Sequence, residues 1–153
     1  RLCRDWSSDV CSSDLRKLPE NVVAIDSSWQ LPQPPLNMQI FELKNIQTYR
    51  LNSFEKYNDD VIAKIDAGII SSAVINPEAK KNNINVKQPS FNADGVIFFN
   101  ITKGVVQRSR TRTSLIFEVS MPMPTPTGNI NVKRKQSMTN LNVLELLEIK
   151  KAS

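Results

Sequence analysis

The stretch QRSRTRTSLIFEVSM, residues 107–121, alternates between two kinds of side chain along its length. One set of alternate positions is mostly apolar and consists of Thr111, Thr113, Leu115, Phe117, Val119 and Met121. The other set is mostly polar and consists of Arg108, Arg110, Arg112, Ser114, Ile116, Glu118 and Ser120. A period of two is that of a β-strand, whose successive side chains point to opposite faces of a sheet. The stretch therefore predicts a strand with one face on a core and one basic face in solvent.

The segments on either side predict further strands. VIFFNIT (residues 96–102) is apolar at nearly every position, as expected of a buried strand, and Lys103-Gly104 offers a turn after it. PMPTPTG (122–128) has proline at every second position and predicts a stiff loop. NINVKRK (129–135) then returns as another strand.

The register of that returning strand follows from matching apolar to apolar positions. Pairing Lys133 with Glu118 puts Val132 against Val119. It also puts Lys135 on the face of the three arginines, whereas a slip by one residue would bury both lysines. We expect the first register. The tail NLNVLELLEIKK (140–151) is compatible with either a short helix or a strand, because its periodicity does not decide between them.

The first half of the chain predicts two short strands and one helix. The strands are NVVAI (21–25) and MQIFELK (38–44), joined by a proline-rich connector, LPQPPL (31–36). Asn52 and Glu55 have the spacing of a helix capping box, and Gly68 is a natural helix end. Between them the apolar residues recur at steps of three and four, as in an amphipathic helix: Phe54, Tyr57, Val61, Ile65 and Ile69. The run IISSAVI (69–75) predicts a strand, and residues 76–95 predict mostly surface loop.

These elements together predict an α+β domain over residues 16–153. We expect an antiparallel sheet of about four to five strands with one amphipathic helix packed on it.

The first fifteen residues differ from everything that follows. DWSSDVCSSDL, residues 5–15, resembles the in-frame translation of a common sequencing adapter at every position. We therefore expect residues 1–15 to be a non-native, disordered tail and the protein's own N-terminus to be lost beyond the junction. Cys3 and Cys11, the only cysteines, both lie in this tail and report nothing about a redox compartment.

The composition of residues 16–153 restricts the chemistry. The segment contains neither Cys nor His. Cysteine–histidine zinc sites, a histidine general base and a serine–histidine–aspartate triad are therefore excluded from it. We expect a protein that is not an enzyme and that uses no cofactor or metal. No apolar run approaches the roughly 20 residues that span a bilayer, so we expect no membrane partner.

The charge is placed unevenly. Residues 103–137 carry seven positive side chains and one negative one, and the rest of residues 16–153 is balanced. Arg108, Arg110 and Arg112 form a basic strip interleaved with Ser and Thr, and Lys133 and Lys135 extend it onto the next strand. Guanidinium groups bind phosphate through two parallel hydrogen bonds, and hydroxyl groups can add neutral contacts. These five residues are our candidate site for RNA or single-stranded DNA.

A second interpretation uses the same residues differently. Arg and Lys also decorate exposed sheets and prevent strand-to-strand aggregation. The chain would then be a structural or protein–protein interaction module with a solvated basic face. Self-association through sheet edges fits either interpretation. The salt dependence of binding separates the two, because binding to a polyanion weakens steeply with salt.

VVQRSRTRTSLIFEVSMPMPTPTG, residues 105–128, resembles the middle strands of single-stranded RNA phage coat proteins. There a Q-x-S-R-x-R run leads into alternating apolar residues and a proline-bearing loop. The resemblance implies an antiparallel sheet in an intertwined dimer, a shell built from such dimers, and RNA on the inner face of the sheet near Arg108, Arg110 and Arg112. The chain departs from that pattern in its long N-terminal part, and the expected pair of interlocking C-terminal helices is either absent or cut short at Ser153.

Overall fold

The computed structural model describes residues 23–149, apart from the side chain of residue 88, and shows an almost entirely β chain. Seven strands form one antiparallel sheet. They are β1 (Ser28–Pro32), β2 (Leu36–Asn37), β3 (Phe41–Tyr57), β4 (Asp60–Ile75), β5 (Asn85–Asn100), β6 (Val105–Thr125) and β7 (Gly128–Glu145). The single helix among the described residues is the five-residue α2 (Pro77–Lys81). The predicted α+β class with an amphipathic helix is therefore wrong.

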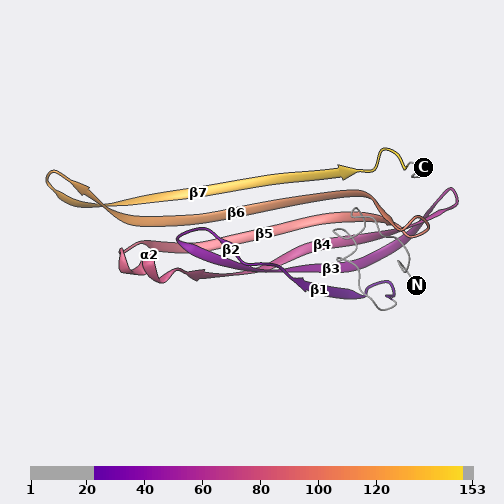
Figure 1. The fold of residues 1–153 in the computed structure, drawn as a ribbon, viewed down its shortest axis with the longest axis horizontal. Helices are drawn as coiled ribbons and strands as arrows, with labels where there is room; N and C mark the ends of the chain where they lie inside the picture. The colour runs from indigo at the N-terminus through magenta and orange to yellow at the C-terminus, as the bar shows by residue number, and fades with distance from the viewer. Residues whose placement is uncertain (1–22, 150–153) are drawn as a thin grey trace.

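The sheet has the strand order β1-β3-β4-β5-β6-β7, with β2 paired to the end of β3. Figure 1 shows the long strands running along the length of the molecule, with β7 at one margin. The β3–β4 and β5–β6 turns lie at one end, and α2 and the β6–β7 turn lie toward the other. The proposed adapter tail, residues 1–15, lies outside the described residues. Of the strand predicted at 21–25, the described residues 23–25 are not in a strand.

A β-hairpin replaces the predicted amphipathic helix. Strands β3 and β4 pair from Phe41 with Ile75 to Tyr57 with Asp60. The turn between them is Asn58-Asp59, and Asn58 has φ 54°, a left-handed conformation that Asn tolerates better than most residues.

The apolar stripe of the predicted helix does not act as a unit in this hairpin. Tyr57 is 66% exposed and Phe54 is 44% exposed, whereas Ile65 is 3% exposed. The helical pattern rests on only five apolar residues, and the pairing of two long strands outweighs it.

The sheet forks where Gly68 of β4 pairs with Asp94 of β5. Beyond this point residues 69–75 pair only with β3, and residues 85–93 pair only with β6. The helix α2 connects the two arms. The prediction of a strand at 69–75 is confirmed, but the prediction of mostly loop at 76–95 is wrong, because β5 begins at Asn85.

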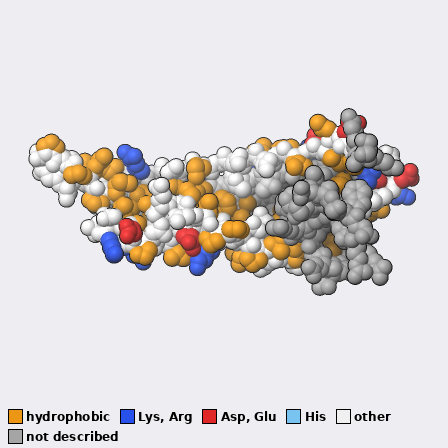
Figure 2. Space-filling model, in the orientation of Figure 1, with side chains coloured by type: hydrophobic (Ala, Val, Ile, Leu, Met, Phe, Trp, Pro, Cys, Tyr) orange, Lys and Arg blue, Asp and Glu red, His pale blue; other side chains and the backbone are white. Residues whose placement is uncertain are grey.

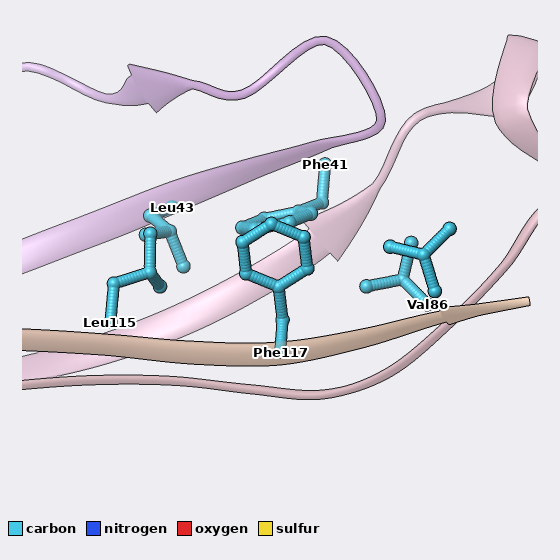
Figure 3. Packing of buried hydrophobic residues seen from close by; sticks show 6 residues of the cluster. Phe41, Leu43, Val86, Leu115 and Phe117 are labelled. Atoms are coloured by element: carbon cyan, nitrogen blue, oxygen red, sulfur yellow. The ribbon is translucent and has the colours of Figure 1, made fainter. Parts of the chain in front are cut away.

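The two arms of the fork pack against each other through side chains. Phe41 and Leu43 of β3 contact a cluster formed by Val86, Leu115, Phe117 and Val119 of β5 and β6 (Figure 3). The rings of Phe41 and Phe117 meet edge to face, with their centroids 5.1 Å apart. We call the face of the sheet that carries these side chains the inner face. A second inner-face cluster, in the half where the sheet is continuous, consists of Tyr49, Leu51, Ala63, Ile65, Ile97 and Phe99.

The alternation that predicted β6 is confirmed. Leu115, Phe117 and Val119 are all buried, and the residues between them, Ile116 and Glu118, are exposed. The strand is longer than predicted, however, because it continues through Pro122 and Pro124 to Thr125. Proline is tolerated there because β5 begins only at Asn85, which pairs with Ser120, so that beyond Ser120 β6 has only β7 as a neighbour.

The predicted register between β6 and β7 is wrong by two residues. Glu118 pairs with Lys135 rather than with Lys133, because the connecting turn, which joins Thr125 to Gly128, is centred one residue later than the predicted register requires. A shift by two keeps every side chain on its predicted face, so both lysines still lie on the face of the arginines. The tail, for which helix and strand were both open, is a strand as far as Glu145.

Candidate nucleic-acid interface

Three arginines of β6 form a ridge on the face of the sheet opposite the core, which we call the outer face. Arg108, Arg110 and Arg112 (the arginine ridge) are all exposed, and Ser109 and Thr111 between them point to the inner face. The ridge borders a shallow depression in the surface. Its other lining residues include Asp66, Asp94, Val96, Phe98 and Leu141. The structure therefore brings the three predicted arginines together.

The ridge arginines have no ionic partner within residues 23–149. Arg112 lies directly across from Asp94 of β5, and Arg108 lies across from Glu145 of β7, yet neither pair approaches as an ion pair. The surrounding acids lower the local positive charge, but they leave the guanidinium groups able to donate all their hydrogen bonds to a ligand.

Lys133 and Lys135 lie on the same face as the ridge but apart from it. Lys135 pairs with Glu118 and Lys133 with Ser120, whereas the ridge ends at Arg112. Six residues along β6 separate Arg112 from Glu118, which is about 20 Å of extended strand. The candidate residues therefore form two separate basic groups rather than one continuous strip.

A third lysine, which the sequence analysis did not single out, belongs to the second group. Lys87 of β5 pairs with Glu118 from the side opposite Lys135. One carboxylate therefore lies between two exposed lysines, and Lys87, Lys133, Lys135 and Glu118 line one surface depression. We call these three lysines the lysine group. The pairing of β5 with β6, which defines this group, requires the strand at 85–90 that was predicted as loop.

The two neighbouring phenylalanines of β5 have different environments. Phe99 is 4% exposed and packs in the inner-face cluster. Phe98 points to the outer face, directly across from Arg108, and lines the depression beside the ridge. It is half-buried, so part of its ring is available on the basic surface. An aromatic ring beside exposed arginines is the arrangement on which single-stranded bases stack.

A small cavity opens on the inner face, away from the basic groups. It has a volume of about 180 Å³, and its lining includes Trp29, Tyr49, Phe99, Asn142 and Leu144. Trp29 stacks on Tyr49 with ring centroids 5.5 Å apart. The Tyr49 hydroxyl donates a hydrogen bond to Gln47 Oε1 at 2.7 Å, and burial raises the pKa of Tyr49.

A polar cluster joins the start of β4 to the β5–β6 turn. Asp60 Oδ2 accepts hydrogen bonds from Lys103 Nζ at 2.6 Å and from Asn100 Nδ2 at 2.9 Å. The bond from Lys103, followed by that from Asn100, lowers the pKa of Asp60. Asn100 is only 2% exposed and also accepts a hydrogen bond from the backbone N–H of Lys103. This cluster fixes the turn that precedes β6, so its role is structural.

The described residues contain no group of three or more metal-binding side chains that could hold an ion. No helix in this part of the chain is long and apolar enough to cross a membrane.

The chain matches no protein-family model, no curated protein and no solved structure. The geometry of the outer face is therefore what supports a function.

Proposed function

We propose that the protein is a non-enzymatic binding protein that holds a polyanion, RNA or single-stranded DNA, on the outer face of its sheet. The observation that carries this proposal is the arginine ridge. Three exposed guanidinium groups lie at alternate positions of one strand, without ionic partners in the described residues, beside the half-buried ring of Phe98. Phosphates would contact the arginines, and an unpaired base would stack on Phe98.

The lysine group extends the proposed footprint. A strand of nucleic acid that follows β6 from the ridge would reach Lys135 after about 20 Å and Lys133 after about 26 Å. Between the two groups lie Ser114 and the 37%-exposed Ile116, which carry no charge. The footprint therefore consists of two phosphate-binding ends with a neutral stretch between them, and long oligonucleotides should bind more tightly than short ones.

The local resemblance to phage coat proteins suggests a more specific form of the same function, in which assembled copies hold RNA on one face of a shell. In that form Arg108, Arg110 and Arg112 would be the residues that face the RNA.

The acids opposite the ridge support the competing function, that of an interaction module with a solvated basic face. Asp94 and Glu145 are placed as cross-strand partners that would stabilise the sheet by a few tenths of a kcal/mol each. The two functions make opposite predictions for Asp94→Asn. Removing this carboxylate should strengthen nucleic-acid binding if the ridge holds phosphates, and should only lower stability slightly if the ridge is structural.

The experiment is a titration of the full chain against a labelled single-stranded RNA by fluorescence anisotropy at several salt concentrations. We expect log K to fall linearly with log salt. The variant with Arg108, Arg110 and Arg112 all changed to Ala should bind much more weakly. Its salt slope should be smaller by about 2, because each lost phosphate contact on a single strand contributes about 0.7.

A matched variant removes three charges elsewhere. Lys56, Lys80 and Lys81 are exposed and lie outside both basic groups, so changing all three to Ala should alter binding only through net charge. Equal losses in the two triple variants would show that binding reflects net charge alone. No binding by the folded wild-type chain would rule out the proposal.

A further inference from the structure

The outer edge of β7 is a long sheet edge without a hydrogen-bonded neighbour in the described fold. All eighteen residues of β7, Gly128–Glu145, pair with β6 on one side, and no described strand lies on the other side (Figure 1). The opposite margin of the sheet is β1, which has five residues and ends at Pro32. Shortness and proline are devices that protect a sheet edge from pairing with another chain. β7 has neither, and its register with β6 contains no bulge.

The second half of β7 has almost no charged side chains that would hinder its pairing with another chain. Lys133, Arg134 and Lys135 lie in the first half and Glu145 lies at the end, and residues 136–144 contain no charge, no Pro and no Gly. Four large apolar side chains in this segment are between 43% and 52% exposed: Met138, Leu141, Val143 and Leu144. Figure 2 shows hydrophobic side chains at the surface along the part of this face that the grey atoms leave visible. An uncharged, exposed, apolar edge is a template for adding a strand.

We propose that this edge pairs with the same edge of a second copy, giving a twofold dimer in which β7 runs antiparallel to the partner's β7 and the two sheets become one. A second copy fits because the segment is complementary to itself. In an antiparallel pair, residues directly opposite each other lie on the same face of the sheet. The twofold axis must therefore pass through a residue position of β7 and not between two residues, and each register is named by that central residue.

Centring on Leu141 gives the best match. Leu141 then lies opposite Leu141 of the partner subunit, and Met138 lies opposite Leu144 of the partner subunit. Because β7 ends at Glu145, which would lie opposite Ser137 of the partner subunit, the basic residues 133–135 lie beyond the paired segment and away from their own counterparts. Centring one residue earlier would pair Lys135 with Glu145, but it would leave Leu144 opposite Gln136. Because cross-strand apolar pairs stabilise a sheet more than exposed ion pairs do, we favour the register centred on Leu141.

The dimer would also bring the arginine ridges of the two copies close together on one face. Arg112 of β6 lies directly across from Leu141 of β7 in the same copy. The two copies of Arg112 would therefore be separated by three strand spacings, about 14 Å. The ridges lie on the same face of the combined sheet, and both remain exposed. The pairing itself does not depend on nucleic-acid binding.

The test measures the mass of the nuclease-treated full chain by sedimentation over a range of concentrations. We expect a concentration-dependent dimer with a dissociation constant on the order of micromolar, since one added strand pair makes a small interface. Leu141→Lys should weaken the dimer at least tenfold, because the substitution places two lysines directly opposite each other. Circular dichroism should show that this variant folds, since Leu141 is exposed.

Two further samples make the test specific. An equimolar mixture of Leu141→Lys with Leu141→Glu should form a heterodimer, because Lys and Glu then face each other at the twofold axis. Ile130→Lys changes a side chain on the same strand that is 51% exposed, against 52% for Leu141, but lies outside the paired segment, and should leave the dimer intact. A chain that stays monomeric at all concentrations, a dimer that survives Leu141→Lys, or one lost equally in Ile130→Lys would overturn the proposal.

Discussion

The packing of the two arms can be tested through Phe41 and Phe117. Phe41 is fully buried and Phe117 is 5% exposed, and each comes from a different arm of the fork. Replacing a buried Phe by Ala costs about 3–5 kcal/mol in the free energy of unfolding. An edge-to-face pair of rings adds about 0.5–1.5 kcal/mol beyond the buried area. We therefore expect each single Ala variant to lose about 3–5 kcal/mol. The double variant should lose less than the sum, by about 0.5–1.5 kcal/mol.

The assay is urea unfolding of the full chain and of the three variants, analysed as a double-mutant cycle. Since a domain has only about 5–15 kcal/mol of stability, the two residues should also be changed to Leu, which keeps the variants folded while removing the ring contact. Phe54→Ala serves as the control, because Phe54 is 44% exposed and should cost well under half as much. A coupling energy of zero between Phe41 and Phe117 would refute the packing of the arms described above.

Three further predictions concern the hairpin, the fork and the polar cluster. Asn58→Ala should destabilise the protein by about 1–2 kcal/mol because Asn58 has φ 54°, whereas a helix at this position would be stabilised by Ala; urea unfolding gives the sign. Gly95→Val should cost about 1–3 kcal/mol in the same assay, because a Cβ there would lie 2.7 Å from the carbonyl oxygen of Arg110, and an unchanged midpoint would contradict this close approach. The lowered pKa of Asp60 means that its contribution to stability is complete above the unfolded-state pKa near 4 and is lost as the pH falls through the folded-state value. Unfolding measured between pH 6 and pH 2 should therefore show a smaller loss for Asp60→Asn than for the wild type, and equal losses would contradict the hydrogen bonds from Lys103 and Asn100.

The strands of the second half were predictable because their alternation is long. Between Leu115 and Met121 most changes of face coincide with a change of polarity, and the period of two extends back to Arg108, so the pattern predicted both the core residues and the exposed arginines. The three arginines of the candidate site could therefore be predicted on one face. Their distance from Lys133 and Lys135 could not be predicted, because it depends on the exact position of the β6–β7 turn, and the prolines suggested a longer loop in place of the end of β6.

The structure of the first half was predicted wrongly because its apolar residues fit both the spacing of a helix and that of a strand. The residues from Phe54 to Ile69 match a helical stripe, but Ile65 is the only member of that stripe that is buried. The other buried residues nearby, Leu51, Ile62 and Ala63, lie outside the stripe. The signal that could have decided the question is Asn58-Asp59, a turn dipeptide in the middle of the supposed helix. The strand at 85–93 carried no such signal, since its stretch of Asn, Lys, Gln, Pro and Ser is typical of loops.

The fork in the sheet leaves two further strand edges that could pair with another chain. Where β4 and β5 separate, residues 69–75 and 85–93 each have one side without a hydrogen-bonded neighbour in the described fold. If the two arms moved apart, both of these backbone edges would become available to another chain. Ile70 and Val74 are already half-exposed on one of them. The contact between Phe41 and Phe117 would then hold the two arms together, and its loss would lead to aggregation before global unfolding.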